Sequence, residues 1–157
     1  ILIDGVRVSS SRIRQMIGDG RVAEVKKMLG RYHFLSGRIV GGHERGRGLG
    51  FPTANLSTLT EVLPPDGIYA TLLHRSDKSL PSVSSIGVNP TFGDGPRTVE
   101  SFIMNFDENI YGETVKLSLV QRIRDEQKFP SVEALIAQIR DDVNRAENIF
   151  SRTKFDR

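Results

Sequence analysis

The chain has 157 residues, of which 38% are hydrophobic and 26% are charged. This balance is typical of a globular domain with a buried core, and it excludes intrinsic disorder and membrane-spanning segments. The 22 basic and 19 acidic side chains give a net charge of +3, which suits a polyphosphate ligand at least as well as a nucleic acid. Cysteine is absent, which excludes disulfides and thiol catalysis and fits a reducing, cytoplasmic compartment.

The sequence pattern of residues 1–30 predicts two helices. One of the serines at positions 9 to 11 can cap a helix that runs through Ile17 and ends at the glycines that follow. A second short helix is predicted by apolar residues at helical spacing and is closed by Gly30. The chain begins with Ile rather than Met, so we expect a piece of a longer protein, with one unit over residues 1–30 and another over residues 31–157.

From residue 34 to about residue 124 the pattern is β. Short runs with partial alternation are separated by Gly and Pro clusters, as in a small antiparallel barrel or sandwich. These runs cover residues 34–40, 68–74, 82–88, 99–106 and 115–123.

A last helix is predicted over residues 131–150. Ser131 follows a proline and can cap this helix. One apolar stripe is expected to pack on the barrel, and it consists of Val132, Leu135, Ile136, Ile139, Val143, Ala146 and Phe150. Asp141 and Asp142 fall on or beside the opposite, polar face, so we expect both to be solvated.

Residues 41–50 form a loop that is rich in glycine and arginine. Glycine lets backbone amides approach an anion closely, and arginine adds donors suited to phosphate oxygens. The loop therefore predicts a phosphate-binding site, with Gly42, Arg45, Gly46, Arg47, Gly48 and Gly50 as candidate contacts. The alternative is a long hairpin loop whose glycines serve only its turns.

Thr53 and Asn55 follow this loop directly. Pro52 biases its neighbour toward extended backbone, and in an extended segment positions 53 and 55 project from the same side. A hydroxyl and an amide beside a phosphate site can hold a hard cation such as Mg²⁺.

Glu100 is the acid that the pattern singles out. Alternation places it on the same strand face as Phe102, Met104 and Phe106, which we expect to point into the core. A carboxylate at an open mouth of the barrel would have a pKa raised toward the range of a general base. The alternative is a glutamate at a strand end that reaches solvent or pairs with Arg97 or Lys116.

Several segments, in order, resemble the riboflavin kinase family, and in particular the C-terminal kinase half of the bacterial bifunctional riboflavin kinase/FAD synthetase. The resemblance covers about residues 31–150. It rests on residues 46–55 (GRGLGFPTAN), 67–70 (GIYA), 86–92 (IGVNPTF), 98–100 (TVE), 105–107 (NFD) and 111–112 (YG), and on Arg124 and Phe129.

The resemblance implies a mainly β fold, a six-stranded antiparallel Greek-key barrel with a C-terminal helix and a short helical N-terminal segment. It implies transfer of the ATP γ-phosphoryl group to the 5′-hydroxyl of riboflavin, which makes FMN for flavin biosynthesis. By similarity, Thr53 and Asn55 bind Mg²⁺ with ATP, the glycine loop covers the phosphates, and Glu100 is the base. The implied flavin contacts are Asn89, Thr91, Arg97, Arg124 and Phe129.

Residues 8–14 also resemble the tail motif of the adenylyltransferase half of those bifunctional enzymes. The His-containing nucleotide motif of that half is missing here, so we expect no FMN adenylylation from this piece and expect that half in the full-length chain. Family members often carry His where Phe102 stands and Asp where Asn105 stands; if either position matters for flavin binding or strand packing, the affinity for flavin differs.

A non-catalytic barrel that binds flavin, a nucleotide or a nucleic acid is the alternative function. Aromatic residues make up only 7% of the chain and no stacking platform is evident, so we expect no nucleic-acid partner. A ligand sensor is less expected because Thr53, Asn55 and Glu100 are all present.

Overall fold

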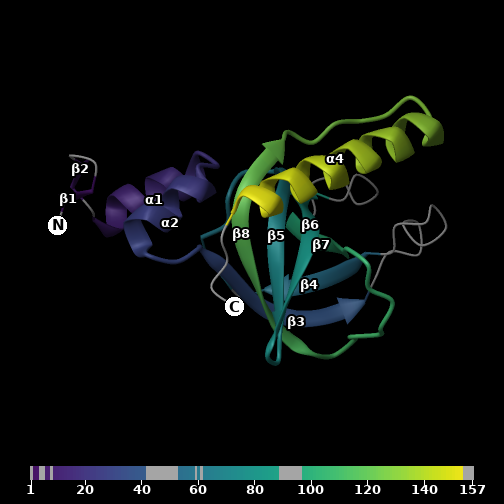
Figure 1. Ribbon diagram of the computed structural model, residues 1–157, viewed down its shortest axis with the longest axis horizontal. Coiled ribbons are helices and arrows are strands. Elements are labelled where there is room, and N and C mark those ends of the chain that lie inside the picture. The colour runs from purple at the N-terminus through teal and green to yellow at the C-terminus, as the bar shows by residue number, and fades with distance from the viewer. Residues whose placement is uncertain are drawn as a thin grey trace.

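The computed structural model describes residues 2–3, 6–7, 9–41, 53–58, 60, 62–88 and 97–153 (Figure 1). Within these residues, six antiparallel strands close into a barrel. Around the barrel they follow the order β3 (Phe34–Gly41), β4 (Ala54–Thr58), β7 (Arg97–Ile103), β6 (Lys78–Val88), β5 (Gly67–Arg75) and β8 (Thr114–Arg124). Among the four consecutive strands β5 to β8, the last strand, β8, lies beside the first, β5. This arrangement is a Greek key. The expected fold class is confirmed.

Five of the six barrel strands correspond to runs identified from the sequence. The strand that the alternation missed is β4, which has only five residues and mixes polar with apolar positions. The run predicted over residues 99–106 ends earlier, at Ile103. Asn105, two residues later, has a φ of 52°, a left-handed conformation that asparagine tolerates better than most residues.

The N-terminal segment contains a two-stranded hairpin and two helices. The hairpin pairs β1 (Leu2–Ile3) with β2 (Val6–Arg7), and the helices are α1 (Ser10–Gly18) and α2 (Val22–Leu29). Ser9 caps α1 by accepting a hydrogen bond from the Arg12 amide, and α2 ends at Gly30, whose φ of 77° suits glycine. Val22 is fully buried and belongs to the same cluster as the barrel core. Helix α2 therefore packs directly against the barrel.

The barrel interior combines an apolar core with a short network of hydroxyl groups. The core is built from side chains such as Leu35, Tyr69, Ile86, Val99 and Leu117. Buried hydroxyls bridge β5, β6 and β7 at oxygen–oxygen distances of 2.7–2.8 Å, and they belong to Thr71, Ser82, Ser84 and Ser101. Each of these buried polar groups thus has a partner, as stability requires.

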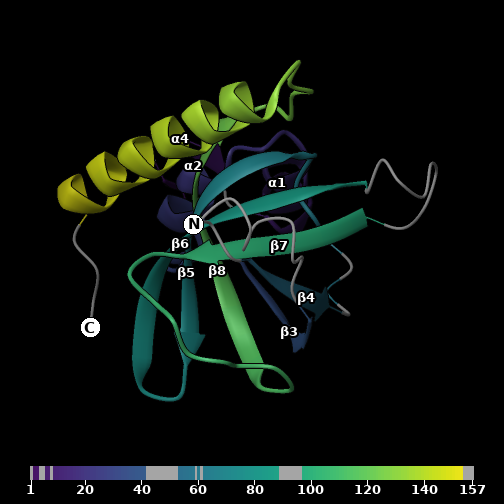
Figure 2. The same ribbon diagram turned by 90° about the vertical axis from the view of Figure 1, so that its right-hand side faces the viewer.

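The last helix, α4 (Val132–Arg152), covers part of the outer face of the barrel, away from β3 and β4 (Figures 1 and 2). Ser131 caps it as predicted, accepting a hydrogen bond from the Ala134 amide. Its buried apolar side chains, Ala146 and Ile149, pack on a second cluster formed by outward-facing residues of β5 and β8. Val132 was predicted to pack on the barrel but is 53% exposed, because the packed face is rotated from the expected stripe.

Asp142 occupies the middle of that packed face, and the prediction that it is solvated was wrong. It is 2% exposed. Its carboxylate accepts two hydrogen bonds from Arg124 at the end of β8, at 2.8 and 2.7 Å, and a third from Gln138 at 3.0 Å. This bidentate pair has the geometry that makes arginine–carboxylate contacts strong, and it fixes α4 to β8.

The substitution Asp142→Ala should lower the free energy of unfolding by about 3 kcal/mol, because it leaves the Arg124 guanidinium without its buried partner. Asp141→Ala is the matched control, since the neighbouring aspartate is exposed and should change stability by less than about 0.5 kcal/mol. Urea denaturation of both variants measures the difference. Equal stability of the two would show that the pair does not hold the helix.

Candidate functional site

One row of cross-strand neighbours runs around the outside of the barrel and contains three of the six predicted site residues that the structure describes. Asn55 on β4 is paired with Glu100 on β7, and Glu100 is paired with Ser85 on β6. Ser85 is paired with Ile68 on β5, which is paired with Arg124 on β8. Paired residues of antiparallel strands project from the same face, so these five side chains line one strip of the outer wall.

The structure corrects the face assigned to Glu100. The residues of β7 that point into the barrel are Val99, Ser101 and Ile103, all of them buried. Glu100 and Phe102 lie on the outer face and are half-buried. Large side chains misled the alternation because the barrel has apolar residues on both faces, inside the core and beneath α4.

Two oxygen atoms at one end of the row lack partners. Thr53 precedes β4, and Asn55 lies in it. Thr53 Oγ1 and Asn55 Oδ1 are buried, yet among the described residues neither atom has a hydrogen-bond partner. Leaving a buried polar atom unsatisfied costs free energy, so a pair of them at one place indicates a site that a ligand completes.

The donor set fits a hard cation. Mg²⁺ prefers oxygen ligands and is commonly held by a few protein oxygens together with phosphates and water. In the described residues no three His, Asp or Glu side chains are grouped to hold a metal ion. Thr53 and Asn55 therefore fit a cation that arrives with a phosphate ligand better than a cation held by the protein alone.

Glu126 joins the row from the segment that follows β8, a contact that the sequence analysis missed. Ser85 Oγ donates a hydrogen bond of 3.1 Å to Glu126 Oε1. The carboxylate also lies against Gly87, where a Cβ atom would stand only 2.3 Å from Oε1. Partial burial, followed by the charges of Asp66 and Glu100, raises the pKa of Glu126, while Ser85 and Arg124 oppose the shift. Strand alternation could have placed Ser85 on the outer face, but no local signal joins positions 85 and 126.

The predicted flavin contacts that the structure describes lie at two places. Arg124 ends the row, and its guanidinium stands 5.8 Å from the centre of the Phe129 ring. Arg97 begins β7 and is bound to the Asp66 carboxylate at 2.7 Å and to the Pro64 carbonyl. Arg124 and Phe129 are thus brought together, whereas Arg97 is held by a separate ion pair.

The remaining predicted contacts lie outside the described residues. They are the phosphate-loop residues Gly42, Arg45, Gly46, Arg47, Gly48 and Gly50 and the flavin contacts Asn89 and Thr91. The strands on either side are described: β3 and β4 pair with each other, and so do β6 and β7. Both undescribed segments therefore connect neighbouring strands of the barrel.

The two described histidines have structural partners. His33 Nε2 lies 2.8 Å from the Val62 carbonyl, and burial lowers the pKa of this histidine. The ring nitrogens of His74 lie 2.9 Å from Ser79 Oγ and 2.7 Å from Ser118 Oγ. Both rings are accounted for by contacts within the fold.

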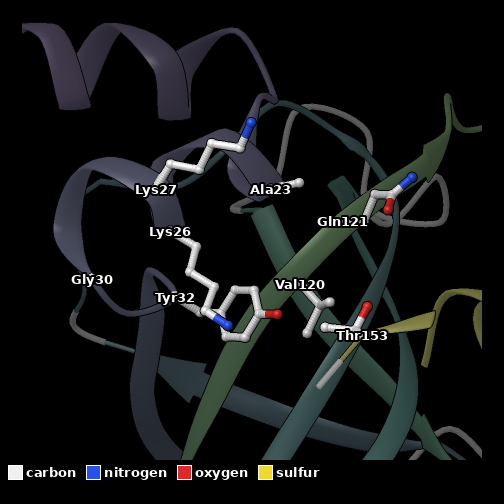
Figure 3. A pocket seen from close by; sticks show the side chains of 8 residues that line it. All are labelled: Ala23, Lys26, Lys27, Gly30, Tyr32, Val120, Gln121 and Thr153. Carbon is white, nitrogen blue, oxygen red and sulfur yellow. The ribbon is translucent and has the colours of Figure 1, made fainter. Parts of the chain in front are cut away.

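A separate cavity of about 390 Å³ lies between α2 and β8 (Figure 3). Its walls include Lys26, Tyr32 and Val120, and the Lys26 ammonium group stands 4.6 Å from the centre of the Tyr32 ring. None of the predicted site residues lines this cavity. The cavity therefore marks the junction between the N-terminal helices and the barrel rather than the candidate site.

No helix among the described residues is both long and apolar enough to cross a membrane. The longest, α4, carries charged side chains along much of its length.

Comparison with known proteins identifies a family and several relatives of this chain. The family model for flavokinase, described as riboflavin kinase, matches residues 29–150. The bifunctional riboflavin kinase/FMN adenylyltransferase of Escherichia coli K12 is 38% identical over 96% of this chain, and that of Bacillus subtilis is 33% identical over 94%. The chain spans about half the length of these curated relatives, 48% in both cases.

Two solved structures resemble the fold. One is described as a macrolide-efflux protein from Streptococcus pneumoniae, with 39% identity and a TM-score of 0.86 over 93% of this chain and 48% of that one. The other is riboflavin kinase from Trypanosoma brucei, with 28% identity and a TM-score of 0.56 over 76% of this chain and 80% of that one.

The substitution Thr53→Val should raise the free energy of unfolding by about 1 kcal/mol without ligand, because it replaces an unsatisfied buried hydroxyl with a methyl group of similar size. Thr58→Val is the matched control: its hydroxyl donates to the Ser36 carbonyl at 2.6 Å, so its loss should cost about 1 kcal/mol. Chemical denaturation compares the two. If Thr53→Val destabilises as much as Thr58→Val, the Thr53 hydroxyl has a partner within the protein.

Proposed function

The chain belongs to the riboflavin kinase family, and we propose that it transfers the γ-phosphoryl group of ATP to the 5′-hydroxyl of riboflavin, which yields FMN and ADP. The observation that carries this proposal is the pairing of Glu100 with Asn55 on the outer wall of the barrel. A proton acceptor then stands beside Asn55, whose Oδ1, like the Oγ1 of Thr53 two residues earlier, lacks a partner among the described residues.

Thr53 and Asn55 would hold the Mg²⁺ ion. Bound there with ATP, the ion would neutralise charge on the phosphates, which is what phosphoryl transfer chiefly requires besides positioning. The main-chain amides and arginines of the glycine loop, residues 42–50, are proposed to cover the same phosphates.

Glu100 would act as the general base. As the 5′-oxygen of riboflavin attacks the γ-phosphorus, its proton passes to the Glu100 carboxylate, and the bond between the β,γ-bridging oxygen and the γ-phosphorus breaks to release ADP. Its place in the row supports this role, since Asn55 lies on one side of it and Ser85 on the other. Nucleotide and acceptor can then approach the carboxylate from opposite sides.

The flavin ring is proposed to lie toward Arg124 and Phe129, with Asn89, Thr91 and Arg97 contributing from β7 and the segment before it. Arg124 gives two of its donors to Asp142 and a third to the Asp125 carbonyl, so it would act chiefly by holding its surroundings in place.

Residues 1–30 are proposed to be the end of the FMN adenylyltransferase half that the longer relatives carry. The relatives named above are bifunctional and about twice as long as this chain, which supports this assignment. The proposed partners are thus ATP and riboflavin for residues 31–157, and the adenylyltransferase half for the whole protein.

The substitution Glu100→Gln should reduce kcat by a factor of about 10² to 10⁴, because the amide cannot accept the proton, while nucleotide binding is retained. The reaction is followed by chromatography of FMN formed from riboflavin, ATP and Mg²⁺. Glu147→Gln, an exposed position on α4, serves as the control and should keep wild-type turnover.

Two results would count against the proposal. If folded wild-type protein forms no FMN but still binds flavin, the barrel is a ligand sensor. If the wild type is active and Glu100→Gln keeps its rate, the chain is a kinase but its base is another group.

A further inference from the structure

Glu126 stands beside the row of site residues, and the proposed phosphoryl transfer does not use it. Its carboxylate accepts a hydrogen bond from Ser85, which lies in the row between Glu100 on β7 and Ile68 on β5. Arg124 lies one strand further on. Glu126 is therefore located over the stretch of wall between the proposed base and the proposed position of the flavin ring.

The chemistry of this position favours a ligand that donates hydrogen bonds. An ionised carboxylate is an acceptor only, and its two oxygens can receive neighbouring hydroxyl groups at once. Such charge-assisted hydrogen bonds are stronger than those between neutral groups. A phosphate group would be repelled there by Glu126 itself and by the nearby Asp66 and Glu100, whose charges are felt at Glu126.

The geometry of the row matches the shape of the acceptor. Neighbouring strands lie about 4.8 Å apart, so the path from Glu100 across β6 and β5 to Arg124 crosses two intervening strands. If the 5′-hydroxyl meets Glu100 and the ring lies near Arg124, the sugar-alcohol chain that joins them must pass over Ser85. That is where the Glu126 carboxylate is held.

We infer that Glu126 binds the hydroxyl groups of the ribityl chain and selects an acceptor in which the flavin ring carries a polyol. This inference rests on the proposed function, because it takes riboflavin as the acceptor. It adds a specificity-determining residue on the acceptor side of the site.

Gly87 is the feature of β6 that makes room for this carboxylate. A side chain at position 87 would begin 2.3 Å from Glu126 Oε1 and 2.4 Å from Oε2, so one of the two groups would have to move. Gly87→Ala therefore displaces Glu126 without changing its chemistry.

The test is steady-state kinetics of the chain with Glu126→Ala and Glu126→Gln. Loss of a charge-assisted contact to the acceptor should raise KM for riboflavin about tenfold or more in Glu126→Ala, and severalfold in Glu126→Gln. KM for ATP and kcat should change by less than about twofold, since the contact is made equally in the ground and transition states. Asp125→Asn is the matched control, because this neighbouring carboxylate is 83% exposed and pairs with Arg122.

Lumiflavin, which has the ring without the ribityl chain, separates binding of the polyol from support of the fold. Its inhibition constant against riboflavin should be the same for the wild type and Glu126→Ala. If lumiflavin inhibition weakens as much as riboflavin binding, or if KM for ATP rises in parallel, Glu126 is structural and the inference is wrong.

Gly87→Ala provides a second, independent variant, and it should raise KM for riboflavin in the same direction. An unchanged KM for riboflavin in both Glu126→Ala and Gly87→Ala overturns the inference. The two proposals fail in different ways: a wild type that forms no FMN refutes the proposed function, whereas an active wild type with an equally active Glu126→Ala refutes only the role of Glu126.

Discussion

The register of five neighbouring strands is the constraint on which the candidate site depends. Asn55, Glu100, Ser85, Ile68 and Arg124 come from five strands but lie in one row because each is the direct partner of the next. A slip of one residue at any of these pairings would turn that side chain into the barrel. The closed sheet fixes all the registers together, since it has no free edge along which a strand could shift. Closure of the barrel therefore also fixes the relative positions of the candidate site residues.

The inner and outer faces of the barrel wall differ in composition and in their role in the structure. The interior is filled by aliphatic side chains and by hydroxyls that bond one another, so it contributes stability and holds the strands in place. Part of the outer face is also apolar, because α4 covers β5 and β8 there. The outer face of β4 and β7 carries the polar side chains of Asn55 and Glu100, with Phe102 on the same face of β7. The site thus lies where the outer wall passes from its covered part to its polar part, which lets a ligand contact apolar and charged groups at once.

Local patterns in the sequence predicted the helix ends and most of the barrel strands, whereas the site residues that they singled out remain predictions. Serine caps the start of α1 and of α4, and a glycine ends α2, as the sequence predicted. The short motifs singled out Thr53, Asn55 and Glu100. The face of Glu100 was misjudged because alternation cannot tell an apolar interior from an apolar exterior under a helix. The contacts of Asp142 with Arg124 and of Glu126 with Ser85 were missed because they join residues that are 18 and 41 positions apart. Such pairings are decided by how the elements pack, and no spacing within one segment encodes them.

The charge of the side chains differs between the β4 end and the β6 end of the row. At the β4 end, Thr53 and Asn55 offer neutral oxygens, which carry no charge that would repel a polyphosphate and which have the chemistry that a hard cation prefers. At the β6 end, Glu126 and Asp66 add negative charge beside Glu100, and partial desolvation together with the nearby charges of Asp66 and Glu100 raises the pKa of Glu126. Like charges would repel a triphosphate on that side, whereas a neutral ligand rich in hydroxyl groups could donate hydrogen bonds to the carboxylates. In the proposed reaction, this difference in charge would place the triphosphate on the β4 side of Glu100 and the polyol on the β6 side.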